Sequence, residues 1–144
     1  MFKNRNIKLA TLNLEVEIDY NFQLIAISSN QKVYTLCWAI NNMLSANLKL
    51  AEGHTINVKK RSVQFRKYIS NESGFYFSLL CNKNLNSRLL PEISTVDFVI
   101  KIYDDDSPYS EAEIISKLRR LKEVQAVYSL DVLKLKSRQA LIYD

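Results

Sequence analysis

Residues 89–98 read Leu89-Leu90-Pro91-Glu92-Ile93-Ser94-Thr95-Val96-Asp97-Phe98, and here a proline leads directly into the most strongly β-forming segment of the chain. From Val96 to Tyr103, β-branched and aromatic residues recur with a period of two, which predicts a central strand. Pro91 has no amide hydrogen for a sheet ladder and favours an extended Leu90, so we expect it just before the strand. One face of this strand would carry Val96, Phe98, Ile100 and Ile102, and the other Asp97, Val99, Lys101 and Tyr103.

The N-terminal third predicts one strand and two helices. Alternation of Leu12, Leu14, Val16 and Ile18 with polar residues indicates a strand over about 8–18. Asp19 could cap a short helix that contains Phe22 and Ile25 and ends near Ser29. Apolar residues then recur at helical spacing from about Gln31 to Ala46, with Trp38 beside the apolar stripe.

The remaining two thirds predict a hairpin, a helix and a last strand. Residues 48–57 give a weak signal, with a loop at Gly53-His54. Val63 and Phe65 then alternate with basic and polar residues in a strand, and Asn71-Glu72-Ser73-Gly74 is a turn to a second strand that ends at Cys81. Together with the strand after Pro91, this hairpin would form an antiparallel meander. Ser110-Glu111-Ala112-Glu113 has capping-box spacing and should begin a helix that ends near Glu123. The strand 125–130 follows, either as a crossover beside a parallel neighbour or on the other side of the sheet.

These elements predict one α+β domain over residues 1–144. We expect a two-layer sandwich, with a mostly antiparallel sheet of about five strands and three helices on one face. The length suits one hydrophobic core, and only two glycines and two prolines occur in 144 residues. No apolar run reaches 18 residues, and the first residues lack the apolar core of a signal peptide, so the expected compartment is the cytoplasm, without a membrane partner.

The stretch from Leu90 to Phe98 resembles the signature of the IPExxxVDY family of uncharacterised bacterial proteins. Leu90 stands for the isoleucine of that motif and Phe98 for its tyrosine, while Pro91, Glu92, Val96 and Asp97 match it. Two further regions are similar to that family, residues 19–38 and residues 130–137. The resemblance implies no assigned activity, and because genes of the family often lie beside that of ribonuclease III, it hints at RNA metabolism.

Few residues are candidates for catalysis or metal binding. His54 is the only histidine, and no motif places a nucleophile beside it, so we interpret it as an exposed loop residue. Cys37 and Cys81 lack the close spacing of metal ligands and are expected to be buried thiols. Nucleotide binding through a glycine-rich loop is excluded by the two glycines. No cofactor and no small-molecule substrate is inferred.

Two groups of carboxylates have alternative interpretations. Asp104, Asp105 and Asp106 could bind Mg²⁺ or Ca²⁺, although they lack the spacing of a calcium loop and could instead favour the start of the next helix. Glu92 and Asp97 could form an acid and base pair. The structural interpretation is preferred, with Glu92 accepting backbone hydrogen bonds and Asp97 pairing with a cation across the sheet.

The basic stretch after residue 58 is the candidate nucleic-acid surface. Cations on an exposed strand could bind phosphates while Tyr68 and Tyr76 stack on bases, and Lys134, Lys136 and Arg138 could extend the surface. The net charge of +5 permits such a partner without requiring it. Alternatively, these cations keep an exposed strand soluble. The possible contacts are Lys59, Lys60, Arg61, Arg66, Lys67 and Tyr68.

The chain ends in an apolar segment that must be buried somewhere. It could dock on its own domain, on a second copy, or on another protein, because leaving such side chains in water forfeits roughly 1.5 to 3 kcal/mol each. The possible protein contacts are Leu133, Leu135, Leu141, Ile142 and Tyr143. The sequence therefore favours a non-catalytic protein-interaction or adaptor module, with a small RNA-associated protein as the alternative.

Overall fold

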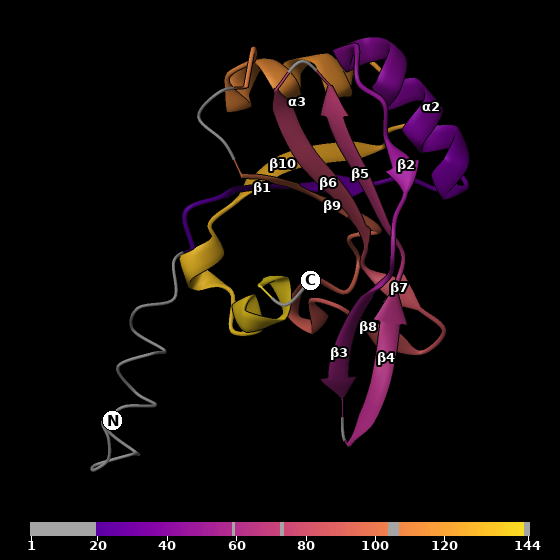
Figure 1. The fold of residues 1–144 in the computed structure, drawn as a ribbon, viewed down its shortest axis with the longest axis vertical. Coiled ribbons are helices and arrows are strands. Elements are labelled where there is room, and N and C mark those ends of the chain that lie inside the picture. Colours follow the sequence, from indigo (N-terminus) through magenta and orange to yellow (C-terminus); the bar gives the residue numbers. More distant parts are fainter. Residues whose placement is uncertain (1–19, 59, 73, 104–106, 143–144) are drawn as a thin grey trace.

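The computed structural model describes residues 20–58, 60–72, 74–103 and 107–142. Its main sheet has six strands in the order β10-β1-β9-β6-β5-β2, and every neighbouring pair is antiparallel. Two α-helices lie on one face of the sheet, above it in Figure 1. The predicted α+β class and the mostly antiparallel sheet are confirmed. The sheet strands are β1 (Gln23–Ser28), β2 (Lys49–Leu50), β5 (Lys67–Glu72), β6 (Phe75–Cys81), β9 (Phe98–Ile102) and β10 (Ala126–Leu130).

The strand that follows the proline is β9, between β1 and β6 in the middle of the sheet. All five of its residues are buried, Phe98, Ile100 and Ile102 on the helix side and Val99 in the cluster on the opposite side. Pro91 opens a 3-10 turn, η1 (Pro91–Ile93), just before the strand. The predicted central strand and the position of the proline are both confirmed.

One of the three predicted helices is wrong, because the short helix expected from Phe22 to Ser29 is strand β1. Leu24, Ile25, Ala26 and Ile27 are consecutive and fully buried, with Ile25 and Ile27 facing the helices and Leu24 facing the opposite cluster. A strand buried on both faces carries a continuous apolar run, which periodicity alone cannot tell from a buried helix. The expected strand over 8–18 and the capping residue Asp19 lie outside the described residues.

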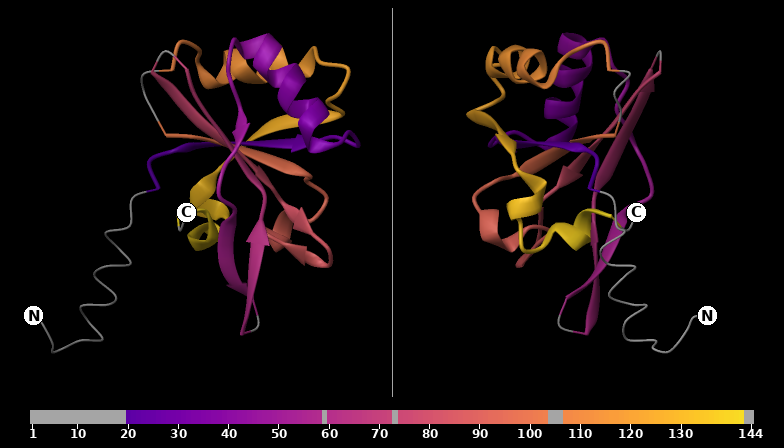
Figure 2. Two further views of the ribbon diagram at one scale, coloured as in Figure 1. Left: turned by 45° about the vertical axis from the view of Figure 1, so that its right-hand side comes forward. Right: turned by 90° about the vertical axis from the view of Figure 1, so that its left-hand side faces the viewer.

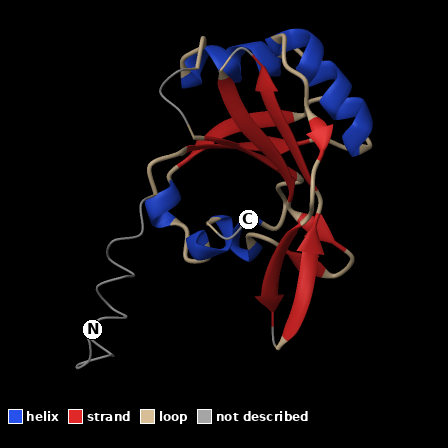
Figure 3. Cartoon of the chain, in the orientation of Figure 1, coloured by secondary structure: helices blue, strands red, loops and turns tan. Residues whose placement is uncertain are grey.

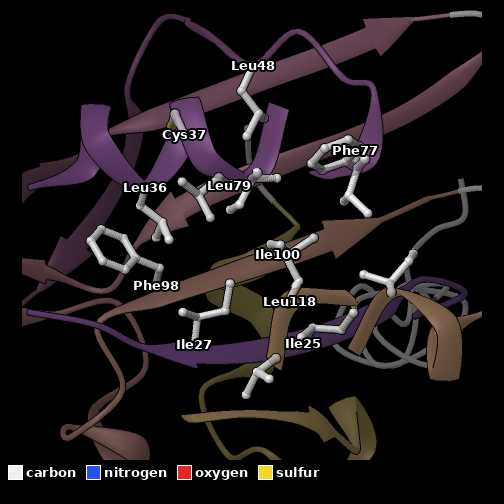
Figure 4. Close-up of a cluster of buried hydrophobic side chains, with 14 of the residues drawn as sticks. Ile25, Ile27, Leu36, Cys37, Leu48, Phe77, Leu79, Phe98, Ile100 and Leu118 are labelled. Atoms are coloured by element: carbon white, nitrogen blue, oxygen red, sulfur yellow. The ribbon is translucent and has the colours of Figure 1, made fainter. Parts of the chain in front are cut away.

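The two helices are α2 (Val33–Leu44) and α3 (Glu111–Arg119). Both fall inside the ranges predicted from helical spacing, and the capping box of Ser110 and Glu113 forms, with the Glu113 amide donating to Ser110 Oγ at 3.1 Å. Figure 4 shows Leu36 and Cys37 of α2 and Leu118 of α3 converging on β1, β6 and β9. Together with the buried residues of these strands, they form the main core.

The strand β10 follows α3 and pairs with β1, not with β9. Since β9 and β10 are each antiparallel to β1, they run parallel to one another with β1 inserted between them. The connection through α3 is therefore a crossover that skips one strand.

The β5–β6 hairpin confirms the predicted hairpin and meander, with Gly74 in the turn at φ +82°. Val63 and Phe65, however, belong to a separate hairpin of β3 (His54–Val58) and β4 (Arg61–Phe65), which projects beside a small hairpin of β7 (Lys83–Asn84) and β8 (Ser87–Arg88) in Figures 1 and 3. The predicted loop at His54 is wrong, because His54 begins β3 opposite Phe65.

Apolar side chains also cover the second face of the sheet, the face opposite the helices. The sequence analysis predicted cover on one face only. A cluster there joins Phe65 of the β3–β4 hairpin, Leu89 and Leu90 before the proline, and Leu135 and Leu141 of the C-terminal segment. That segment contains the 3-10 turns η2 (Val132–Lys134) and η3 (Arg138–Leu141) and lies across the sheet from α2 and α3 (Figure 2). The helices and the C-terminal segment thus cover opposite faces.

Candidate functional site

A buried asparagine organises the stretch around Pro91. Asn82 Nδ2 donates to the carbonyls of Ile93 (3.1 Å) and Val96 (2.9 Å), and Asn82 Oδ1 accepts from the Leu90 amide (2.7 Å). These three bonds fix the chain on both sides of the 3-10 turn η1. The side chains of Glu92 and Asp97 are therefore held at defined places on the second face.

Glu92 and Asp97 both have structural partners, as preferred from the sequence. Glu92 accepts from the amide (2.9 Å) and hydroxyl (2.5 Å) of Ser137, which ties η1 to the C-terminal segment. Burial opposes ionisation of Glu92, but these hydrogen bonds outweigh it and lower the pKa of the carboxyl. Asp97 accepts from the Ser29 amide (2.8 Å) and forms an ion pair with Lys83 (2.6 Å).

His54 and Lys101 hold the C-terminal segment against the second face of the sheet. His54 is fully buried, and its Nε2 is hydrogen-bonded to the Ala140 carbonyl, so the expectation of an exposed histidine is wrong. Lys101 is also buried and donates to the Leu141 carbonyl, with its ammonium 4.5 Å from the ring centroids of both Phe22 and Tyr103. A buried cation and a buried imidazole thus bind main-chain carbonyls here.

The residues predicted for protein contact divide into two groups. Leu135 and Leu141 are buried in the second-face cluster, and Ile142 is half-buried, so these side chains dock on their own chain. Leu133 is 67% exposed. Tyr143 lies outside the described residues.

The residues predicted for nucleic-acid contact do not share one surface. Lys60, Arg61 and Arg66 are exposed, whereas Lys67 is only 6% exposed. Tyr68 packs against the main core, where burial raises the pKa of its phenol. The register of β5 and β6 places Tyr76 on the opposite face from Tyr68, in ring contact with Tyr103 at 5.2 Å between centroids. Lys59 lies outside the described residues.

The two thiols are buried, as predicted. Burial, with a smaller contribution from Cys81, raises the pKa of the Cys37 thiol to about 12, and burial raises that of Cys81 to about 11. Both thiols are therefore protonated and poorly nucleophilic at neutral pH. Asp104, Asp105 and Asp106 lie outside the described residues, and among those that are described no three His, Cys, Asp or Glu side chains converge as metal ligands do.

The outward face of α2 is the surface that our sequence analysis did not identify. Tyr34 and Trp38, four residues apart and therefore on one side of the helix, are each 65% exposed. No charged residue occurs from Val33 to Leu44. The sequence could have indicated this surface, because Tyr34 and Trp38 lie outside the buried apolar stripe of a helix that has no charged residue.

No protein-family model matches the chain, and comparisons with curated proteins and with solved structures found no similar protein. The resemblance to the IPExxxVDY family therefore stays a prediction. In the described part of the chain, no helix combines the length and apolar character needed to cross a membrane.

Proposed function

We propose that this protein is a non-catalytic interaction module of the cytoplasm that binds a partner protein through the outward face of α2. The observation that supports this most directly is the pair Tyr34 and Trp38, exposed on a helix without a charged residue. Interfaces are enriched in aromatic residues and depleted of charge at their centres, and tryptophan and tyrosine are the residues that most often dominate binding energy.

The flanking charges favour a partner of a particular kind. Lys32 and Lys49 are exposed on either side of α2 in sequence, and no aspartate or glutamate occurs from Tyr20 to Ala51. A second copy would offer no carboxylate from this region to these lysines. A different protein, with carboxylates around an apolar pocket, would complement the face better.

The α2 face is held rigidly against the sheet. Leu36, Cys37 and Ile40 of α2 are buried in the main core, and Asn41 is hydrogen-bonded to the backbone of Leu48, accepting from its amide at 2.7 Å. The segment that leads to β2 is thereby fixed to the C-terminal half of α2. A surface fixed in this way loses little conformational freedom on binding.

Capture from a native extract, treated with nuclease, would test the proposal. The expected result is a protein retained by the wild-type chain and lost with Trp38→Ala. Retention should survive Arg119→Ala, a matched change on the exposed side of α3. Equal retention by the wild type and Trp38→Ala would contradict the proposal, and a change in sedimentation mass caused by Trp38→Ala would identify the occupant as a second copy.

An RNA-associated function is the second candidate, supported by the β3–β4 hairpin. Lys60 and Arg61 are exposed at its turn, and within the described ranges neither forms an ion pair with a carboxylate. RNA binding there should weaken steeply with salt, and Lys60→Glu with Arg61→Glu should abolish it while Lys117→Glu does not. Binding that is insensitive to the hairpin variants would remove this candidate.

A further inference from the structure

A pocket of about 570 Å³ lies where three distant parts of the chain meet. Its walls come from β3, from the segment 88–91 that includes the proline, and from the C-terminal segment 136–140. The volume is in the range of small-molecule sites. The lining residues are Thr55, Ile56, Asn57, Arg88, Leu89, Pro91, Lys136, Ser137, Gln139 and Ala140.

The charged lining of this pocket is entirely cationic. Arg88 and Lys136 line it, and no lining residue is an aspartate or glutamate. Arg88 Nη1 donates to the carbonyls of Leu85 (3.3 Å) and Ser87 (3.1 Å), so its bonds go to neutral acceptors of its own hairpin. Its Nε is buried and has no hydrogen-bond partner among the described residues. Within the same residues, the Lys136 ammonium forms no ion pair, although the Lys136 amide is a hydrogen-bond partner of Glu92.

The Glu92 carboxylate of the signature stretch is hydrogen-bonded to Ser137. Glu92 directs its two oxygens at Ser137 and does not line the pocket. Through that contact, Glu92 positions the segment that carries Lys136, and the neighbouring Pro91 also lines the pocket. Of the residues that resemble the family signature, Pro91 therefore lines the pocket, and Glu92 contributes no negative charge to its lining.

The rest of the lining combines apolar side chains with uncharged polar groups. Ile56, Leu89, Pro91 and Ala140 supply apolar surface, and Thr55, Asn57 and Gln139 supply hydroxyl and amide groups. A guanidinium and an ammonium suit a phosphate, because both are positively charged donors, arginine as a planar fork of N–H groups and lysine as a point charge. The apolar lining residues suit the organic part of the same molecule.

We propose that this pocket binds a small organic phosphate of nucleoside monophosphate size, with Arg88 and Lys136 at the phosphate and the apolar lining residues against the organic group. This goes beyond the interaction function, because the pocket is on the second face of the sheet and α2 covers the first. Loss of either activity would leave the other measurable.

Titration of the full chain with nucleoside monophosphates would test this site, with calorimetry for affinity and amide chemical shifts for location. We expect binding at low salt, with shifts concentrated at Ile56, Leu89 and Ala140. Lys136→Gln should weaken binding by about tenfold or more, as expected for one charge-assisted hydrogen bond. Lys134→Gln is the matched control, since Lys134 is an exposed lysine on the same segment that does not line the pocket.

Arg88→Lys provides a second variant that keeps the charge and removes the planar fork. It should weaken binding while the amide spectrum shows the fold unchanged. Short single-stranded RNA without a terminal phosphate distinguishes a free phosphate from a nucleic-acid backbone. Binding of this RNA alone, absence of any monophosphate binding, or equal effects of Lys136→Gln and Lys134→Gln would overturn the proposal.

Discussion

Helices α2 and α3 cover the same face of the same sheet, yet their outward sides differ completely. α3 carries Glu111 and Glu113 in its first turn and Lys117 and Arg119 in its last, the arrangement that complements a helix dipole. α2 is longer, with twelve residues against nine, and contains no charge. Both bury an apolar stripe in one core, so folding does not require the difference. We therefore relate the uncharged outer side of α2 to the proposed partner.

The helix ends show the same contrast. α3 begins with a complete capping box, in which Ser110 and Glu113 bond to each other's backbone amides. α2 begins after Lys32, which makes no side-chain capping bond. α3 is thus stabilised at its end by local hydrogen bonds, whereas α2 depends on its packing against the sheet.

The largest expected effect tests the shared inner faces. Leu36→Ala in α2 and Leu118→Ala in α3 each remove a fully buried leucine from the main core. Each should lower the free energy of unfolding by about 3 kcal/mol, the middle of the range for such cavities. Urea unfolding would measure both, with the exposed Arg120→Ala as a control near zero. If only one of the two variants lowered the free energy of unfolding, the inner faces of the two helices would not be equivalent.

The second prediction concerns the outer faces, where the two helices should differ. Trp38→Ala should change the free energy of unfolding by less than about 1 kcal/mol and weaken partner binding by at least about 30-fold, as expected of an interface hot spot. Trp38 is the only tryptophan, so its fluorescence should shift to the blue when the partner covers it. An unshifted emission spectrum at saturating partner would place the contact elsewhere.

Much of the fold could be predicted because turn residues, a capping box, helical spacing and runs of β-branched and aromatic residues mark most of its helices and strands. β6, β9, β10, α2 and α3 were predicted within a few residues, whereas the first strand of the predicted hairpin included Val63 and Phe65, which belong to β4 and not to β5. β1 was not predicted as a strand, since Leu24 to Ile27 is buried on both sides and its apolar run has no period. His54 was assigned to a loop because its partner, the Ala140 carbonyl, lies 86 residues away.

The candidate sites were harder to predict than the fold. Leu135 and Leu141 were identified as apolar residues that needed burial, but only the structure shows that their own second-face cluster buries them. The pocket proposed to bind a phosphate could not be predicted, because its walls come from residues 55–57, 88–91 and 136–140 and meet only in the folded chain. Trp38 was noted in the sequence beside the apolar stripe, but its exposure was not predicted. The comparison with the charged helix α3 shows that an exposed aromatic residue on an uncharged helix is a candidate contact.

The third prediction uses Cys37, a titratable group on the buried side of α2. Burial raises its pKa from the ordinary value of 9.0 to about 12, so above pH 9 the unfolded chain loses this proton while the folded chain keeps it. Stability should therefore fall as pH rises, by about 1.4 kcal/mol between pH 8 and pH 10 for this thiol. Urea unfolding of the wild type and of Cys37→Ala at both pH values isolates this loss, because lysines and tyrosines titrate in both proteins. A pH-independent difference between the two proteins would contradict burial of the thiol.

The fourth prediction removes the feature that α3 has and α2 lacks. Ser110→Ala deletes the hydroxyl that accepts from the Glu113 amide, and should cost about 1 kcal/mol of unfolding free energy. Ser110→Asn, which restores a capping oxygen, should recover most of it. The Ser110 amide and, to a smaller extent, the Ser110 hydroxyl lower the pKa of the exposed Glu113 carboxyl, so this pKa should rise part of the way toward its ordinary value in Ser110→Ala when followed by carbon chemical shifts.

The smallest effect gives α2 the cap it does not have. Lys32→Ser places a hydroxyl at the N-cap, where the backbone is already extended (φ −66°, ψ 148°), and should raise the free energy of unfolding by about 0.5 to 1 kcal/mol. The same change removes one of the two lysines that flank the aromatic pair. If the partner presents carboxylates there, association should slow and lose salt dependence while the chain becomes more stable. A variant that gains stability and keeps its association rate would show that the aromatic residues alone select the partner, because the cap and the rim charge occupy the same position.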